Sequence, residues 1–246
     1  MSAIAKTLQR VGAAAGFNIT RLPGNRFDAM PAVLHRLARE GFAPTAIVDV
    51  GANLGQWSTA VSAVYPGVPL HVIEPQPECR AALDAFVRTR GSAELHGVIV
   101  TRPGVSHVRV VGAGTTGAHV VRDATGRADG QSVPSTTLDA LLAHRFRDAD
   151  RVLLKLDVEG HELEVLAGAE AILKHVEIIV SEVLFYDVEH TGDPTFLDFA
   201  ARLAAFGFVL YDFAALASRP RDGRLRMGDA LFVRRGSRLE ADAAWA

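Results

Sequence analysis

Residues 47–55, Ile-Val-Asp-Val-Gly-Ala-Asn-Leu-Gly, decide the fold of this chain. An apolar run that passes into a turn bounded by Gly51 and Gly55 predicts a strand, a tight turn and then a helix. Because glycine lacks a Cβ atom, the backbone of such a turn can approach a ligand closely, and the helix offers unpaired N–H groups to it. The stretch therefore predicts a nucleotide-like ligand. The Gly-x-Gly-x-x-Gly spacing that folds around a pyrophosphate is absent, which disfavours a dinucleotide.

Short apolar runs alternate with helical patterns on both sides of this stretch. Strands are predicted at 46–50 and 70–74, and helices at 57–64 and 77–88. This βαβ rhythm indicates an α/β fold in which a mostly parallel sheet carries helices on both faces. The remaining predicted strands are 94–100, 105–111, 151–157, 176–182, 208–213 and 229–234, and the remaining predicted helices are 31–40, 137–146, 162–167 and 194–206.

Glycines interrupt this pattern between 112 and 133, where we expect a loop or an irregular hairpin. Ser135 or Thr136 is expected to cap the helix that follows, and Asp193 is expected to cap the last clear helix. Between the last two predicted strands, residues 218–228 are rich in charge and are expected to form a turn.

No internal repeat or low-complexity linker divides the chain, so we expect one domain at 41–246 after a helical extension at 1–40. In this extension, Ile4, Leu8 and Val11 recur at helical spacing. We expect the apolar stripe to pack on the domain or on a second subunit, as in a homodimer, and contact with a membrane surface is the alternative. The sequence shows neither a convincing signal peptide nor the run of about 18 apolar residues that a membrane span requires.

Charge and cysteine content argue against several classes of function. The 246 residues include 26 basic and 28 acidic ones, for a net charge of −2. The chain therefore lacks the basic excess that drives binding to a phosphate backbone, and nucleic acid is not an expected partner. Cys79 is the only cysteine, which excludes an internal disulfide and a cysteine-based zinc site. We expect a cytoplasmic protein, because this cysteine usage fits a reducing compartment.

Two acids near the glycine turn suit the binding of a nucleoside. Glu74 ends the second predicted strand, 23 residues after Gly51, and Pro75 stops the strand there. At about this distance, an acid at a strand tip can accept hydrogen bonds from both hydroxyls of a ribose. Asp49 lies on the first strand, where its carboxylate can bind an amine, shape the turn or serve as a cap. For Glu74, the alternative is a surface carboxylate at a strand end.

A second group of ionisable residues follows the core strand at 151–157. The sequence there reads Lys-Leu-Asp-Val-Glu-Gly-His-Glu from Lys155, and strand alternation puts Lys155 and Asp157 on one face. Glu182 ends the neighbouring apolar strand and is expected to project into the same crevice beside Asp157. Two carboxylates and the His161 imidazole suit proton abstraction, an oxygen-ligated metal ion, or both. The alternative is a charged rim in which Lys155 pairs with Asp157 and His161 caps a helix.

In their order and spacing, these elements resemble the FkbM family of S-adenosylmethionine-dependent methyltransferases over residues 45–235. The resemblance is carried by 48–55, Glu74-Pro75, Leu138-Asp139, 155–162 and Glu182. It implies the Rossmann-like sheet of class I methyltransferases, with seven strands of which the last is antiparallel, and with helices on both faces.

The same resemblance implies S-adenosylmethionine as the cofactor. The residues implied to frame its methionine portion are Asp49, Gly51, Asn53 and Gly55. Glu74 is implied to hold the ribose. Contacts to the adenine are expected near 97–101 or Gln131, where the sequence offers no distinctive match.

The activity implied by the resemblance is O-methylation of an aliphatic or carbohydrate hydroxyl. The expected acceptor is a sugar of a glycolipid, polysaccharide or glycoside, and a polyketide hydroxyl is the alternative. Because such a hydroxyl is a weak nucleophile at neutral pH, the protein must align it and remove one proton, and a general base contributes about 10²–10⁴-fold. We expect His161 or Asp157 to take the proton, and Glu159 and Glu182 to orient the acceptor. Mg²⁺ bound by Asp157 and Glu182 is a further option.

Two other classes of protein compete with this interpretation. A nicotinamide oxidoreductase would use the same strand, turn and ribose-binding acid, but no tyrosine is followed four residues later by the lysine of the familiar proton relay. A non-catalytic interaction module is disfavoured, because ionisable groups gathered in a crevice are costly without a use. The acceptor pocket is expected to form from 21–30, 112–130 and 185–193.

Overall fold

The computed structural model describes Thr7, Val11, Gly12, Ala14, 26–112, 119–120, 130–187 and 192–241. Most of the predicted amphipathic arm, and parts of the predicted acceptor segments at 21–30, 112–130 and 185–193, lie outside these residues. Within the described ranges, no helix combines the length and the apolar character needed to cross a membrane.

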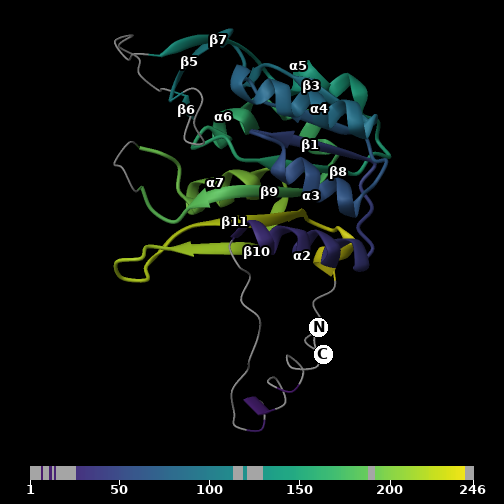
Figure 1. Ribbon diagram of the computed structural model, residues 1–246, viewed down its shortest axis with the longest axis vertical. Helices are drawn as coiled ribbons and strands as arrows, with labels where there is room; N and C mark the ends of the chain where they lie inside the picture. Colours follow the sequence, from purple (N-terminus) through teal and green to yellow (C-terminus); the bar gives the residue numbers. More distant parts are fainter. Residues whose placement is uncertain are drawn as a thin grey trace.

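A seven-stranded sheet runs through the centre of the domain, in the order β3-β2-β1-β8-β9-β11-β10 (Figure 1). The strands are β1 (Ala46–Val50), β2 (Leu70–Ile73), β3 (Ala93–His96), β8 (Val152–Leu156), β9 (Val176–Leu184), β10 (Phe208–Ser218) and β11 (Leu225–Arg234). The five strands from β3 to β9 pair in parallel, and β11 runs antiparallel to both of its neighbours, β9 and β10. This arrangement confirms the predicted seven strands with an antiparallel last strand.

Helices cover both faces of the sheet, as predicted (Figure 1). One face carries α2 (Arg26–Arg39), α3 (Gln56–Val64), α4 (Arg80–Arg90) and α8 (Arg238–Ala241), and the other carries α5 (Leu138–Leu142), α6 (Glu162–Ala167) and α7 (Phe196–Ala205). The described part of the chain also contains the 3₁₀ turns η1 (Pro77–Cys79), η2 (Ala143–Arg145) and η3 (Ile172–Lys174). Each face of the sheet has its own hydrophobic core. Because side chains alternate along a strand, Ile47 packs into the core beneath α2, α3, α4 and α8, and Val48 packs into the core beneath α5, α6 and α7.

A second, four-stranded sheet has the order β4-β7-β5-β6. Its strands are β4 (Ile99–Val100), β5 (His107–Val111), β6 (His119–Val120) and β7 (Gln131–Thr136). The single predicted strand at 94–100 is therefore wrong, because the chain leaves the large sheet after His96 and enters the small one at Ile99. Much of the glycine-rich stretch at 112–133, where a loop or an irregular hairpin is expected, lies outside the described residues. Its described parts include β6, which pairs antiparallel with β5, and the start of β7.

Two predicted helix caps are wrong, because each helix begins later in the chain than expected. Ser135 and Thr136 are still paired in β7, so Thr137 caps α5 instead and its Oγ1 accepts a hydrogen bond from the Ala140 N–H at 3.0 Å. Likewise, α7 begins after Thr195, whose reciprocal bonds with Asp198 form a capping box, and Asp193 lies before it.

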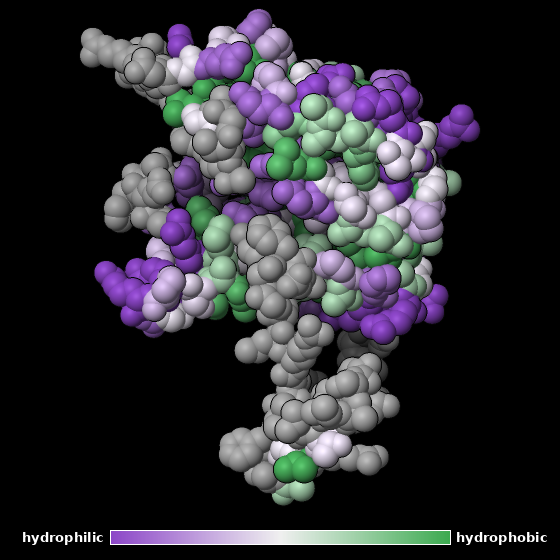
Figure 2. Space-filling view, in the orientation of Figure 1, coloured by the Kyte–Doolittle hydropathy of each residue, from purple (hydrophilic) through white to green (hydrophobic). Residues whose placement is uncertain are grey.

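The β10–β11 hairpin is longer than predicted. Its two strands continue through most of the segment at 218–228, and pairing extends to Ser218 and Leu225. Only the tip retains the predicted charged turn, where hydrophilic side chains gather (Figure 2).

Candidate active site

A pocket opens at the carboxyl ends of β1, β2 and β8, where open α/β sheets bind their ligands. Part of its wall comes from the small sheet, through apolar side chains of β4, β5 and β6. The described residues that line it are Val50, Gly51, Asn53, Ile73, Glu74, Pro75, Gln76, Val98, Ile99, Val100, Val110, Val120, Asp157, Val158, Glu159 and His161. The small sheet, which the sequence pattern did not reveal, is thus part of the site.

The turn after β1 requires glycine at its first position. Gly51 has a φ of 78°, and a Cβ atom there would lie 1.9 Å from the carbonyl oxygen of Asp157. The turn crosses the end of β8 at this point, so it is the protein's own backbone, and not a ligand, that requires glycine at position 51. Gly55, with a φ of 82°, begins α3 and lies against Leu83, not among the lining residues. The two glycines therefore shape the turn, and only Gly51 borders the pocket.

The Glu74 carboxylate is held in place from both sides. Its Oε2 accepts a hydrogen bond from the Asn53 N–H at 2.8 Å, and its Oε1 accepts one from the Gln76 N–H at 3.0 Å. Burial raises the pKa of Glu74, and these two hydrogen bonds partly oppose that effect. A carboxylate can accept about four hydrogen bonds, so the group retains acceptor capacity for a ligand in the pocket beyond its bonds to Asn53 and Gln76.

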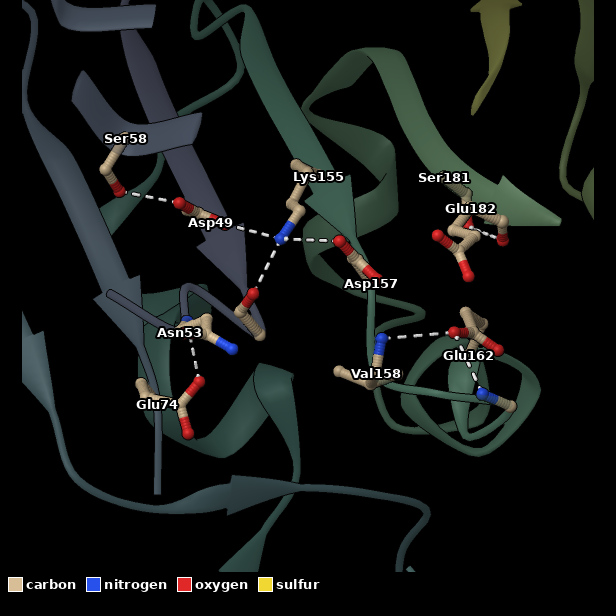
Figure 3. A network of polar contacts seen from close by, with 12 residues as sticks. Asp49, Asn53, Ser58, Glu74, Lys155, Asp157, Val158, Glu162, Ser181 and Glu182 are labelled. Atoms are coloured by element: carbon tan, nitrogen blue, oxygen red, sulfur yellow. Dashed lines mark hydrogen bonds and ion pairs between the residues drawn. The ribbon is translucent and has the colours of Figure 1, made fainter. Parts of the chain in front are cut away.

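Lys155 is the centre of a buried ionic network (Figure 3). Its ammonium lies 3.1 Å from Asp49 Oδ1 and 3.4 Å from Asp157 Oδ2, and it donates to the Gly51 carbonyl oxygen at 2.6 Å. Burial alone would lower the pKa of Lys155, but the two carboxylates outweigh it and hold that pKa above its ordinary value. Ser58 donates to the other oxygen of Asp49 at 2.6 Å.

This network separates the roles of the two aspartates. Asp49 is fully buried under α3 and is not among the described lining residues, whereas Asp157 is half-buried and borders the pocket. Lys155 therefore joins a structural carboxylate to one that a ligand can reach. The ion pair of Lys155 with Asp157 is one of the alternatives that the sequence pattern leaves open, whereas no local pattern indicates the buried partner Asp49.

His161 stands at the start of α6 without capping the helix through its side chain. Its Nε2 lies 2.9 Å from the hydroxyl oxygen of Thr101, which is itself buried. The imidazole is buried and lines the pocket. Thr101 therefore orients the ring, a role that no sequence motif indicated.

Glu159 and Glu182 differ in their relation to the pocket. Glu159 is exposed at its edge, in the left-handed region with a φ of 51°. Glu182 lies on β9, one residue beyond Ser181, and Ser181 pairs with Leu156, the last residue of β8. The register therefore brings Glu182 beside Asp157, which directly follows β8. Figure 3 shows Glu182 next to Asp157, on the side away from Lys155. The described lining residues do not include Glu182.

The proposed Mg²⁺ site at Asp157 and Glu182 finds no support. In the described part of the chain, these two acids do not belong to a group of three or more potential metal ligands. In addition, Asp157 already faces the Lys155 ammonium, which would repel a second cation.

Glu162 is a buried acid to which the sequence pattern assigned no role. Its Oε1 accepts hydrogen bonds from the N–H groups of Val158 at 3.1 Å and Gly160 at 3.3 Å, which fixes the loop between β8 and α6. Burial raises the pKa of Glu162 to about 7, with a further contribution from the charge of Asp157. The sequence signal for this role is an acid, Glu162, in the first turn of a predicted helix and two residues after Gly160, because acids stabilise the N-terminal turn of a helix.

The chain matches the model of the family described as the methyltransferase FkbM domain over residues 49–210. This match covers every element that contributes to the pocket, from the end of β1 to the start of β10. A search of curated proteins gave no match.

Among solved structures, methyltransferase FkbM from Methylobacillus flagellatus KT is 18% identical, with a TM-score of 0.50 over 78% of this chain and 44% of that one. EvdMO1 is 15% identical, with a TM-score of 0.48 over 93% of this chain and 47% of that one. Magnesium protoporphyrin IX methyltransferase from Synechocystis PCC 6803, with bound SAM, is 12% identical, with a TM-score of 0.48 over 95% of this chain and 85% of that one. This chain spans less than half the length of the first two structures. At these identities, the likeness shows the class I methyltransferase fold alone.

Proposed function

The chain belongs to the FkbM methyltransferase family, and we propose that it transfers a methyl group from S-adenosylmethionine to a hydroxyl of an acceptor, in the first place a sugar. The observation that carries this proposal is the pocket between Glu74 and Asp157 at the carboxyl ends of β1, β2 and β8. One end of this pocket presents the fixed carboxylate of Glu74. The other end presents the buried imidazole of His161 and the carboxylates of Asp157 and Glu159.

The Glu74 end of the pocket fits the nucleoside of S-adenosylmethionine. Two backbone N–H groups hold this carboxylate, so both of its oxygens are oriented before a ligand arrives. A ribose presents two hydroxyl donors, which match the two oxygens. The apolar wall from Ile99, Val110 and Val120 suits the flat face of an adenine.

The other end of the pocket supplies the groups for proton removal. When bound, S-adenosylmethionine supplies an activated methyl group on a sulfonium centre. The chain itself must then align the acceptor hydroxyl and accept its proton. His161 is the better candidate base, because Asp157 already serves as a counter-ion of Lys155. Glu159, exposed at the edge of the pocket, is suited to orient an acceptor through hydrogen bonds.

A sugar acceptor agrees with the chemistry of this end of the pocket. Carboxylates accept hydrogen bonds from the several hydroxyls of a sugar, and both Asp157 and Glu159 border the pocket. A polyketide hydroxyl remains the alternative acceptor and belongs in the same screen. A homodimer through the N-terminal helix and a cytoplasmic location stay expectations from the sequence.

The cofactor is tested first by thermal unfolding with excess S-adenosylhomocysteine and, separately, with NAD. At about 100 times its dissociation constant, a ligand stabilises by roughly 2.7 kcal/mol, which for a chain of this size is about 5–10 °C in Tm. We expect this shift with S-adenosylhomocysteine alone. A shift with NAD instead would contradict the proposal.

The reaction is tested by incubating the protein with S-adenosylmethionine carrying a deuterated methyl group and with panels of glycosides and polyketides. Mass spectrometry of the products should show the labelled methyl on a hydroxyl oxygen of a glycoside. Transfer to nitrogen or carbon would contradict O-methylation, and transfer only to polyketides would favour the alternative acceptor.

A further inference from the structure

Two histidines and a glutamate converge on neighbouring strands outside the candidate active site. β2 and β3 pair in parallel, with His71 opposite Glu94 and Ile73 opposite His96. Because side chains alternate along a strand, His71, Glu94 and His96 lie on one face of the sheet. None of the three is among the described residues that line the active-site pocket. His71 and Glu94 instead border a separate depression beside η2.

The spacing of their side-chain atoms suits an ion between them. His71 Nδ1 lies 3.4 Å from His96 Nε2 and 3.8 Å from Glu94 Oε2, and all three potential ligand atoms lie within 4.8 Å of one another. In a tetrahedral zinc site with Zn–N bonds of about 2.0–2.1 Å, two nitrogen ligands are about 3.3–3.4 Å apart. The usual N–H···O hydrogen bond of proteins is shorter, at about 2.9–3.0 Å, so as a hydrogen bond the contact between the two imidazoles is a long one. The histidine pair therefore has the separation of two ligands.

The charges around the three residues favour a metal with affinity for nitrogen. Glu94 is the only acid of the group, and its Oε1 accepts a hydrogen bond from Arg145 Nη2 at 3.3 Å. Arg145 also contacts His144 at 3.2 Å. Ca²⁺ and Mg²⁺ require several oxygen ligands, whereas imidazole suits Zn²⁺, Co²⁺, Ni²⁺ and Cu²⁺.

We propose that His71, Glu94 and His96 bind a divalent transition-metal ion such as Zn²⁺, with a solvent molecule as the fourth ligand. The ion would join β3, the edge strand of the large sheet, to β2. It would act on the stability of this edge, and it is separate from the methyl-transfer proposal, because none of its ligands borders the active-site pocket.

The test uses the full chain without an affinity tag, stripped with a chelator and titrated with Co²⁺ alone. We expect one equivalent of Co²⁺ to produce the visible absorption of a four-coordinate ion, and Zn²⁺ to abolish it. His96→Gln and Glu94→Gln should each weaken Co²⁺ binding by more than about tenfold. His107→Gln, which changes an exposed histidine on β5, is the matched control and should have no effect.

Two outcomes would overturn the proposal. One is the absence of Co²⁺ and Zn²⁺ binding in the wild-type protein, which would leave the residues as a simple imidazole pair. The other is binding that persists unchanged in both variants. Glu94 is exposed, so Glu94→Gln keeps the test valid if a histidine variant does not fold. Zn²⁺ should also raise Tm in the wild-type protein and not in Glu94→Gln.

Discussion

The ammonium of Lys155 lies 3.1 Å from Oδ1 of Asp49, and both side chains are buried between the sheet and α3. The same ammonium donates to the Gly51 carbonyl oxygen, so the ion pair fastens the turn after β1 to the end of β8. The buried ammonium of Lys155 thus contributes both to the stability of the fold and to the shape of the candidate active site.

We expect Lys155→Met to destabilise the protein by about 3–5 kcal/mol, because it leaves the buried Asp49 carboxylate without its counter-ion. Urea unfolding measures this loss. Lys174→Met removes an exposed lysine and should change stability little. In a double-mutant cycle, adding Asp49→Asn should recover part of the loss. Strictly additive effects would contradict a coupled pair.

Gly51→Ala should be much more harmful than Gly67→Ala, although the two glycines have almost the same φ, 78° and 79°. The left-handed conformation costs an alanine about 1–2 kcal/mol at either position. At Gly51, the Cβ would also meet the Asp157 carbonyl oxygen at 1.9 Å, whereas at Gly67 nothing lies within 4 Å. Urea midpoints and calorimetric binding of S-adenosylhomocysteine measure the difference. Equal losses would show that the turn has room to shift.

Glu162 should make stability fall as the pH rises. The pKa of its folded form is about 7, above the ordinary value of 4.5, so the folded state holds the proton more tightly. The resulting stability is fully present below pH 4.5 and is lost as the pH passes through 7. The loss amounts to about 3 kcal/mol, at 1.36 kcal/mol per pKa unit.

Glu162→Gln keeps an oxygen acceptor for the N–H groups of Val158 and Gly160 and cannot ionise. We therefore expect this variant to match the wild-type protein near pH 5 and to exceed it in stability at pH 8. Unfolding curves across this range provide the measurement, with Glu170→Gln, a change at an exposed acid, as the control. A wild-type profile that stays parallel to that of Glu162→Gln would contradict the raised pKa.

The sequence predicted the large sheet because its signals are local. The strand at 46–50 is buried along its whole length and is apolar except for Asp49. A strand of this kind is recognisable from its own sequence, without knowledge of the strands that pair with it. The strand ends carried Glu74 and Asp157, and strand topology alone brings their positions to one edge of the sheet.

The small sheet and the polar partners could not be predicted in the same way. β7 reads Gln-Ser-Val-Pro-Ser-Thr, and it is ordered by pairing with strands distant in the chain. The same holds for Thr101, 60 residues from His161, and for Asp49 and Lys155, which meet across two strands. Such contacts depend on register and side-chain direction, which no local pattern contains.

Glu74→Gln should weaken the binding of S-adenosylhomocysteine by about 10–100-fold, because hydrogen bonds to a charged group contribute about 1.5–3 kcal/mol. Gln retains only one acceptor oxygen, so one of the two backbone N–H groups or one ribose hydroxyl loses its partner. Isothermal titration calorimetry measures the affinity. Glu78→Gln, at an exposed acid of η1, should bind as the wild-type protein does. Unchanged affinity in Glu74→Gln would remove the ribose role.

His161→Asn should lower kcat by about 10²–10⁴-fold while the affinity for S-adenosylhomocysteine stays within error, because the imidazole is assigned to proton removal. Thr101→Val keeps the shape of the side chain and removes the hydroxyl that contacts His161 Nε2, so we expect a smaller loss of kcat and a shifted pH–rate profile. Single-turnover methyl transfer, followed by mass spectrometry across pH, separates the two effects. His107→Asn is the control for loss of a histidine as such. Full activity in His161→Asn would instead assign the proton to Asp157, and Asp157→Asn would then have to abolish transfer without unfolding the protein.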